Sequence, residues 1–283
     1  MTAVLGGLGA AAAWALSAVC SSRSGRMIGA PAVVGWVMIV GLVLAAPLAL
    51  VHGVPRALGG PPGVWLAVSG GANVIGLVFM FGALRVGQVA LVAPLISVEG
   101  AVAAVIAVLA GETLAPGVAV TLTVIVAGII VASIPGRQTA GASQPAHSRA
   151  VIFAAAAALM FGGSLYATAR AGQGLPVAWV ALAARLIGVP ALAVPLALAG
   201  RLSLTRRAIP LLVTSGICEV LGFYSYTAGS RHGVAVAAVL ASQSGTLAGL
   251  AGLALFRERL SRRQLIGVTG VVIGVGVLSA LHT

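Results

Sequence analysis

The chain has 283 residues, of which 60% are hydrophobic and only 7% are charged, and its mean hydropathy is +1.14. Soluble globular domains carry about 25% charged residues, so this composition excludes that class. The net charge of +12 comes from 16 arginines, no lysine and four glutamates. These arginines stand singly or in pairs between apolar runs, without interleaved aromatic residues. They therefore indicate membrane-flanking charge rather than a nucleic-acid surface.

Apolar runs long enough to cross a bilayer recur along the whole chain. A hydrocarbon core about 30 Å thick needs about 20 apolar residues per helix. The runs are continuously apolar rather than alternating, which favours helices over a barrel. We therefore predict an all-α integral membrane protein with ten transmembrane helices. In chain order they cover residues 2–22, 30–52, 62–83, 88–110, 115–134, 149–169, 177–199, 208–228, 233–255 and 264–282.

The second half of the chain repeats the first. With a shift of 146 positions, residues 65–134 align without gaps with residues 211–280 and share 15 identities. The identities include charged loop residues, which apolar composition alone does not explain, and we therefore infer an internal duplication. The matching loop residues are Arg85 and Arg231, Gly87 and Gly233, and Glu112 and Glu258.

The duplication divides the chain into two five-helix repeats, residues 1–134 and 150–283. A polar stretch rich in Pro, Gly and Ser, residues 135–149, reads as a linker between them. Five crossings in each copy place the second copy upside down relative to the first. Inverted repeats of this kind are typical of secondary transporters, in which the substrate site lies near the midplane between the copies.

Local motifs point to a known group. Pro94 falls early in the fourth predicted helix, and a Gly-Glu-x-Leu turn at 111–114 recurs in altered form at 257–260. With the two five-helix halves, these features resemble the EamA-type branch of the drug/metabolite transporter superfamily. The resemblance implies a ten-helix bundle that moves small organic solutes, often outward. The chain departs from a strict repeat at Leu240, which stands where the second copy would repeat Pro94.

Two arguments disagree about the orientation in the membrane. If both termini were cytoplasmic, three arginines of the predicted loops would lie inside and twelve outside. The positive-inside rule therefore favours termini outside, whereas the family resemblance favours termini in the cytoplasm. With either orientation, we expect a multi-pass protein of the cell membrane.

Five polar side chains fall near the middle of predicted helices. A charged residue there costs about 2.5–3.5 kcal/mol by insertion scales, so these side chains are expected to face one another or water. We predict that they form one mid-membrane layer that binds substrate and protons. A static polar cluster that only joins helices is the alternative. The five residues are Asn73, Glu99, Arg185, Glu219 and Gln243.

Aromatic residues accompany this layer. Phe223 and Tyr226 follow Glu219 on the same helix face, and Trp14 either lines the path or packs between helices. Two acids and one base leave a surplus negative charge. Whichever acid, Glu219 or Glu99, lies away from the arginine is the better proton carrier. Its ionised form favours a cation.

The remaining acids and histidines carry no recognisable chemistry. Glu112 and Glu258 begin the loops before the fifth and tenth helices, and we interpret them as structural, because an acid near a helix start interacts favourably with the dipole. The four histidines form no metal-ligand spacing. Without Asp, Lys or a phosphate-binding loop, the sequence indicates neither an enzyme, an ATP-driven pump nor a bound cofactor or metal.

We therefore predict a secondary transporter that exports small metabolites or drug-like amphipathic solutes by alternating access, coupled to protons. An uncoupled facilitator of the same fold is the first alternative. A non-transporting membrane scaffold or sensor and a lipid-carrier flippase are the others. The partners expected are the substrate, the bilayer and protons, with either a monomer or a homodimer as the assembly.

Overall fold

The computed structural model describes residues 2–86, 95–132, 144–245 and 247–248, and the structural statements below concern these residues. They form helices and no strand, which confirms the all-α class. Six segments are long and apolar enough to cross a bilayer, as expected of a multi-pass membrane protein. Their helices are α1 (Thr2–Ile28), α2 (Ala30–Val51), α3 (Pro61–Val86), α7 (Gln144–Gly174), α8 (Val177–Gly188) continued by η3 (Val189–Ala193) and α9 (Val194–Leu198), and α10 (Ile209–Ser230).

The predicted ninth helix, 233–255, is interrupted. α11 (Val234–Ala241) ends at a turn formed by Ser242 and Gln243. The hydroxyl of Ser242 and the side-chain amide of Gln243 both donate to the carbonyl oxygen of Val239, at 2.9 and 3.1 Å. In a continuous helix this oxygen would accept the backbone N–H of Gln243, which donates instead to the next carbonyl along the chain, at 3.1 Å. The side chains thus compete with the helical hydrogen bonds and end the helix.

The predicted fourth helix, 88–110, is interrupted at the corresponding place. α5 (Glu99–Leu109) begins after a turn that starts at Ser97. Glu99 is therefore the first residue of a helix, not a residue halfway along one as the sequence indicated. Ser97 is the repeat counterpart of Gln243, so the breaks in the two halves coincide.

Other helix limits also differ from the prediction. α7 begins at Gln144, so the last six residues of the predicted linker 135–149 are helical. The seventh span contains the π-helical turn η3, because Pro190 has no N–H with which to continue the α-helical hydrogen bonds. The predicted tenth helix, 264–282, lies outside the described residues. The remaining helices are η1 (Arg56–Gly59) and α6 (Pro116–Ala132).

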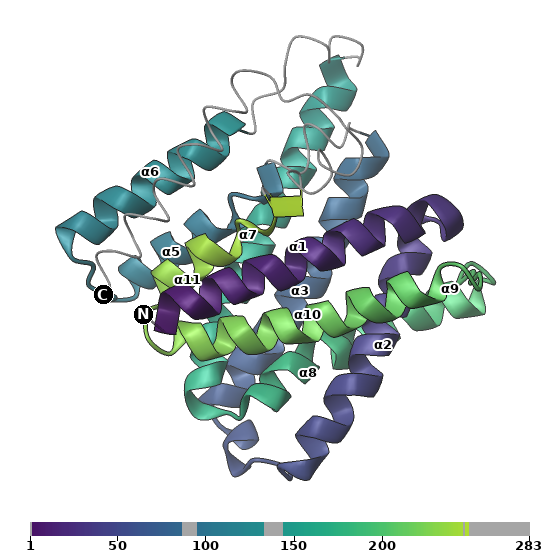
Figure 1. The fold of residues 1–283 in the computed structure, drawn as a ribbon, viewed down its shortest axis with the longest axis horizontal. Helices are drawn as coiled ribbons and strands as arrows, with labels where there is room; N and C mark the ends of the chain where they lie inside the picture. Colours follow the sequence, from purple (N-terminus) through teal and green to yellow (C-terminus); the bar gives the residue numbers. More distant parts are fainter. Residues whose placement is uncertain (1, 87–94, 133–143, 246, 249–283) are drawn as a thin grey trace.

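Helix contacts join the first part of the chain to the second. The two most extensive helix contacts are those of α3 with α7 and of α1 with α10. Figure 1 shows α1 and α10 side by side. α5 packs against α11, and α2 packs against both α8 and α10. Each long helix therefore has its main neighbour far away in the sequence, and the bundle interior is built from both halves.

Two repeat-related serines make the same kind of contact in the two halves. On α3, the Ser69 hydroxyl lies 2.6 Å from that of Thr168, and Ser164 donates to the carbonyl oxygen of Ser69 at 2.8 Å; both partners are on α7. On α10, the Ser215 hydroxyl lies 2.8 Å from that of Ser17 on α1. Hydroxyl pairs of this type join membrane helices where no water competes for the hydrogen bond.

Repeat-related glycines behave in the same way. A Cβ at Gly76 on α3 would lie 2.7 Å from the Phe161 ring of α7, and a Cβ at Gly222 on α10 would overlap the Trp14 indole of α1. Small residues let membrane helices approach closely. These identities between the halves therefore have a packing reason.

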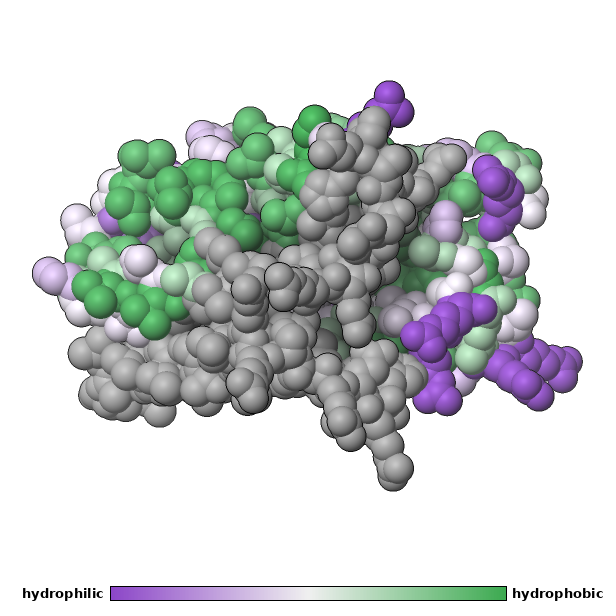
Figure 2. All heavy atoms as spheres, turned by 90° about the horizontal axis from the view of Figure 1, so that it is seen from above, coloured by the Kyte–Doolittle hydropathy of each residue, from purple (hydrophilic) through white to green (hydrophobic). Residues whose placement is uncertain are grey.

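Large apolar side chains cover the outer surface of the described helices. Leu5, Val105 and Ile152 are 60%, 58% and 65% exposed. Among the coloured residues in Figure 2, apolar ones predominate toward one side of the view, and most strongly hydrophilic ones lie toward the other. Apolar patches of this extent are rare on soluble monomers, and they fit contact with lipid chains.

Two neighbouring glycines of α3 offer a test of this packing. A Cβ at Gly70 would lie 2.9 Å from the carbonyl oxygen of Ala183 on α8, whereas a Cβ at Gly71 would meet nothing within 4 Å. We expect Gly70→Ala to lower stability by about 1–3 kcal/mol through overpacking. Gly71→Ala is the matched control and is expected to be neutral or slightly stabilising, because Ala favours the helix. Thermal unfolding in detergent measures both, and equal melting temperatures for the two variants would contradict this packing.

Candidate functional site

A cavity of about 380 Å³ lies between helices of both halves. Two of the four acids in the sequence, Glu99 and Glu219, are part of its wall. The two acids therefore adjoin one common space. The other lining residues are Trp14, Ser17, Ala18 and Ser21 of α1; Val34, Val37 and Met38 of α2; Asn73, Leu77 and Met80 of α3; Phe161, Ser164 and Leu165 of α7; Phe223 of α10; and Ile96, Ser97, Ser242, Ser244 and Gly245 at the helix breaks.

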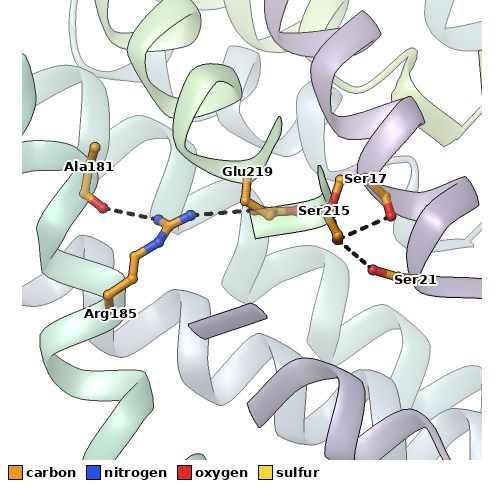
Figure 3. A network of polar contacts seen from close by, with 6 residues as sticks. All are labelled: Ser17, Ser21, Ala181, Arg185, Ser215 and Glu219. Carbon is orange, nitrogen blue, oxygen red and sulfur yellow. Dashed lines mark hydrogen bonds and ion pairs between the residues drawn. The ribbon is translucent and has the colours of Figure 1, made fainter. Parts of the chain in front are cut away.

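Glu219 is held from two sides. Its Oε2 lies 3.6 Å from Nη2 of Arg185 on α8, and its Oε1 accepts a hydrogen bond of 3.1 Å from the hydroxyl of Ser17 on α1. Figure 3 shows this carboxylate between the two partners. The Glu219 side chain is 30% exposed and that of Arg185 is 2% exposed. The acid thus faces the cavity, while the base lies behind it.

Arg185 is surrounded by protein on all sides. Its Nη1 donates to the carbonyl oxygen of Ala181 at 3.1 Å, and its guanidinium carbon lies 4.5 Å from the centre of the Phe223 ring. Gly41 of α2 makes room for it, because a Cβ there would lie 2.9 Å from Nε of Arg185. An arginine can stack on an aromatic face as well as form an ion pair. Both contacts fix its charge beside Glu219.

Three serine hydroxyls continue the network away from the acid. The hydroxyl of Ser215 on α10 lies 2.8 Å from those of Ser17 and Ser21 on α1 (Figure 3). Ser17 bonds both to Ser215 and to Glu219, so the carboxylate is linked to α1 through one residue. Hydropathy gives no indication of these serines, although the identity of Ser215 with Ser69 between the two halves is a signal for one of them.

Glu99 has different surroundings. It lines the cavity as the first residue of α5, directly after the helix break. Among the described residues, no hydrogen bond or ion pair engages its carboxylate. A negative charge at a helix N-terminus is favoured by the helix dipole, but the dipole supplies only part of a counter-charge. Asn73 lines the same cavity from α3.

Aromatic rings form part of the wall. Trp14 packs edge-on against Phe223, with ring centres 5.4 Å apart, and lies 6.2 Å from the ring of Tyr226. Trp14, Phe161 and Phe223 line the cavity. Tyr226 does not, because it is fully buried and its hydroxyl donates to the carbonyl oxygen of Leu165 at 2.9 Å.

The structure therefore divides the eight predicted site residues into two sets. Arg185, Tyr226 and Gln243 are buried and are not among the residues that line the cavity. Each has polar partners within the protein, as burial in a low-dielectric interior requires. The set on the cavity wall consists of Trp14, Asn73, Glu99, Glu219 and Phe223.

Glu112 lies apart from the cavity, at the start of α11. Its carboxylate accepts hydrogen bonds from the backbone N–H groups of Val234 and Ala235, at 3.2 to 3.3 Å. These are free donors of the first helical turn, so the acid caps a helix of the other half. The sequence placed this acid beside the following helix instead. Its repeat counterpart Glu258 lies outside the described residues.

No group of three or more His, Cys, Asp or Glu side chains that could hold a metal occurs within the described part of the chain.

Comparisons with known proteins give a family and a fold. A profile of the EamA-like transporter family matches residues 1–134 and 148–280. A solved crystal structure of a protein with 22% sequence identity superposes with a TM-score of 0.76, covering 99% of this chain and 96% of that one. At this identity the likeness concerns the fold. None of the curated proteins matches the chain.

The Arg185–Glu219 pair predicts a non-additive mutant cycle. Arg185→Leu leaves Glu219 without its counter-charge, and we expect a loss of about 3 kcal/mol, at the low end for buried pairs because Glu219 is partly exposed. The double variant Arg185→Leu/Glu219→Leu is expected to recover most of this loss, since no unpaired charge remains. Thermal unfolding of the single and double variants measures the coupling, and additive effects would contradict it.

Proposed function

The chain belongs to the EamA-like transporter family and is a membrane transporter of small solutes; we propose that it is a secondary transporter that exports small amphipathic solutes by alternating access. The single observation that carries this proposal is the cavity shared by Glu99 and Glu219. Ionisable groups at this depth are costly and mark substrate or ion pathways in membrane proteins. A static cluster would pair both acids, whereas Glu99 faces open space.

Alternating access requires two halves that can rock about the cavity, and we propose inverted repeats for this role. The contacts described above support the proposal. In the second half α7 takes the place of α1 and α10 that of α3, so the α3–α7 contact and the α1–α10 contact are equivalent. The helix breaks at Ser97 and Gln243 also correspond. Discontinuous helices at the repeat interface commonly form the substrate site of secondary transporters.

Glu99 is the proton carrier in this proposal. Glu219 is already engaged by Arg185 and Ser17, so its ionised form is stabilised whether or not substrate is present. Glu99 lacks such a partner among the described residues. A protonated Glu99 leaves the cavity neutral, and its ionised form is available to substrate. The Glu99 carboxyl can therefore exchange a bound proton for bound substrate.

Replacing this carboxyl tests the coupling. We expect Glu99→Gln to abolish the response of solute flux to a pH gradient, because a side-chain amide, unlike a carboxyl, does not take up and release a proton. Glu112→Gln is the matched control, since it removes an acid away from the cavity and keeps an oxygen that can cap α11. Flux is measured in proteoliposomes with and without the gradient.

The outcomes separate the proposal from its alternatives. Flux that ignores the gradient already in the unmodified protein would identify an uncoupled facilitator. Full coupling in Glu99→Gln would assign proton exchange to another group. Absence of flux for a broad panel of solutes would favour a scaffold or sensor.

A further inference from the structure

The charges around the cavity do not balance. Arg185 lies beside Glu219, so these two groups compensate each other. Glu99 remains as one negative charge without a cation among the described residues. Of the 16 arginines in the sequence, Arg185 alone falls in the middle of a predicted span. The part of the cavity wall formed by described residues therefore carries one uncompensated negative charge whenever Glu99 is ionised.

Within the described part of the chain, the wall offers no free cation that would hold a carboxylate on the solute. Arg185 is 1% exposed, and its guanidinium already contacts Glu219, Ala181 and the Phe223 ring. A solute carboxylate in the cavity would instead lie near Glu99, with like-charge repulsion at low dielectric. Amide and hydroxyl groups from Asn73 and the serines can accept or donate hydrogen bonds but carry no charge.

From this arrangement we infer that the transported solute is an organic monocation without a carboxylate group. Its cationic group lies beside the carboxylate of Glu99. The inference rests on the proposed transport function. Trp14, Phe161 and Phe223 supply aromatic faces for the rest of the solute, and such faces also attract ammonium groups. An amino acid, which brings a carboxylate with its ammonium group, is excluded from tight binding.

The charge count also fixes a stoichiometry. The cavity is neutral when Glu99 holds one proton and neutral again when it holds one monocation. When the monocation binds, the proton leaves to the water on that side. An empty, ionised cavity would have to carry an unpaired charge at bilayer depth, which is costly. The exchange is therefore one proton for one monocation, and it moves no net charge.

Three probes with one aromatic body test the solute class. They are N,N,N-trimethylphenethylammonium, phenylalanine betaine, which adds only a carboxylate, and 3-phenylpropionate. Binding to the purified full chain is measured by ligand-induced thermal stabilisation. We expect the first probe to bind at least about 10-fold more tightly than the other two, as one like-charge contact in a partly buried site implies.

Variants show whether Glu99 produces this preference. In Glu99→Gln the preference is expected to fall below about twofold, while Glu112→Gln keeps it. Equal or tighter binding of either carboxylated probe to the unmodified chain would overturn the inference. Binding of none of the three at millimolar concentration would overturn it as well.

Flux of N,N,N-trimethylphenethylammonium tests the stoichiometry. This probe is a permanent cation and cannot cross the bilayer as a free base, so its flux reports the protein alone. In proteoliposomes with a pH gradient, a potassium diffusion potential of either sign should leave its flux unchanged, and a potential-dependent flux would overturn the one-for-one exchange. Selective binding without any flux supports the cation site and contradicts the transport function. Flux of phenylalanine betaine in place of the cation contradicts the inference and leaves the transport function standing.

Discussion

The placement of charge in hydrocarbon is the constraint on which the rest of this structure depends. An arginine in the middle of the apolar span Val177–Leu198 is tolerated because Glu219, a carbonyl oxygen and an aromatic ring surround it. These partners come from α8 and α10, and Ser17 extends the contact to α1. Three helices are thereby fixed at one point. The carboxylate at that point is turned toward the cavity without remaining unpaired.

Small residues determine where the cavity forms. A Cβ at Gly100 would overlap the hydroxyl of Ser242, and a Cβ at Gly245 would lie 2.6 Å from that of Ser97. The broken segments of the two halves therefore lie against each other at their breaks. Helix ends carry unsatisfied backbone groups that need polar surroundings. The cavity lies beside both breaks, since Ser97, Ser242 and Gly245 are part of its wall.

The sequence predicts position along the chain better than direction around a helix. Hydropathy located the six described spans, and three polar residues of the predicted spans, Glu99, Glu219 and Asn73, line one cavity. Tyr226 and Gln243 point elsewhere, because a helix that is apolar on both its lipid and its protein face has no polar stripe to define its rotation. The helix breaks were missed for a related reason. Ser242 and Gln243 act through a local hydrogen-bond competition that average hydropathy does not contain.

The duplicated frame and the chemistry of the site follow different rules. Ser69 and Ser215 are identical in the two copies and make similar contacts, because both copies need close helix packing. The acids are not duplicated: Glu219 corresponds to Asn73, and Glu99 corresponds to Gly245. A strictly symmetric chain would place four acids around one cavity, with mutual repulsion that the bilayer interior does not screen. Because each acid occurs in one copy, Glu219 lies beside Arg185, whereas Glu99 has no cationic partner among the described residues. The two acids, which the proposed exchange requires, thus stand at departures from the repeat.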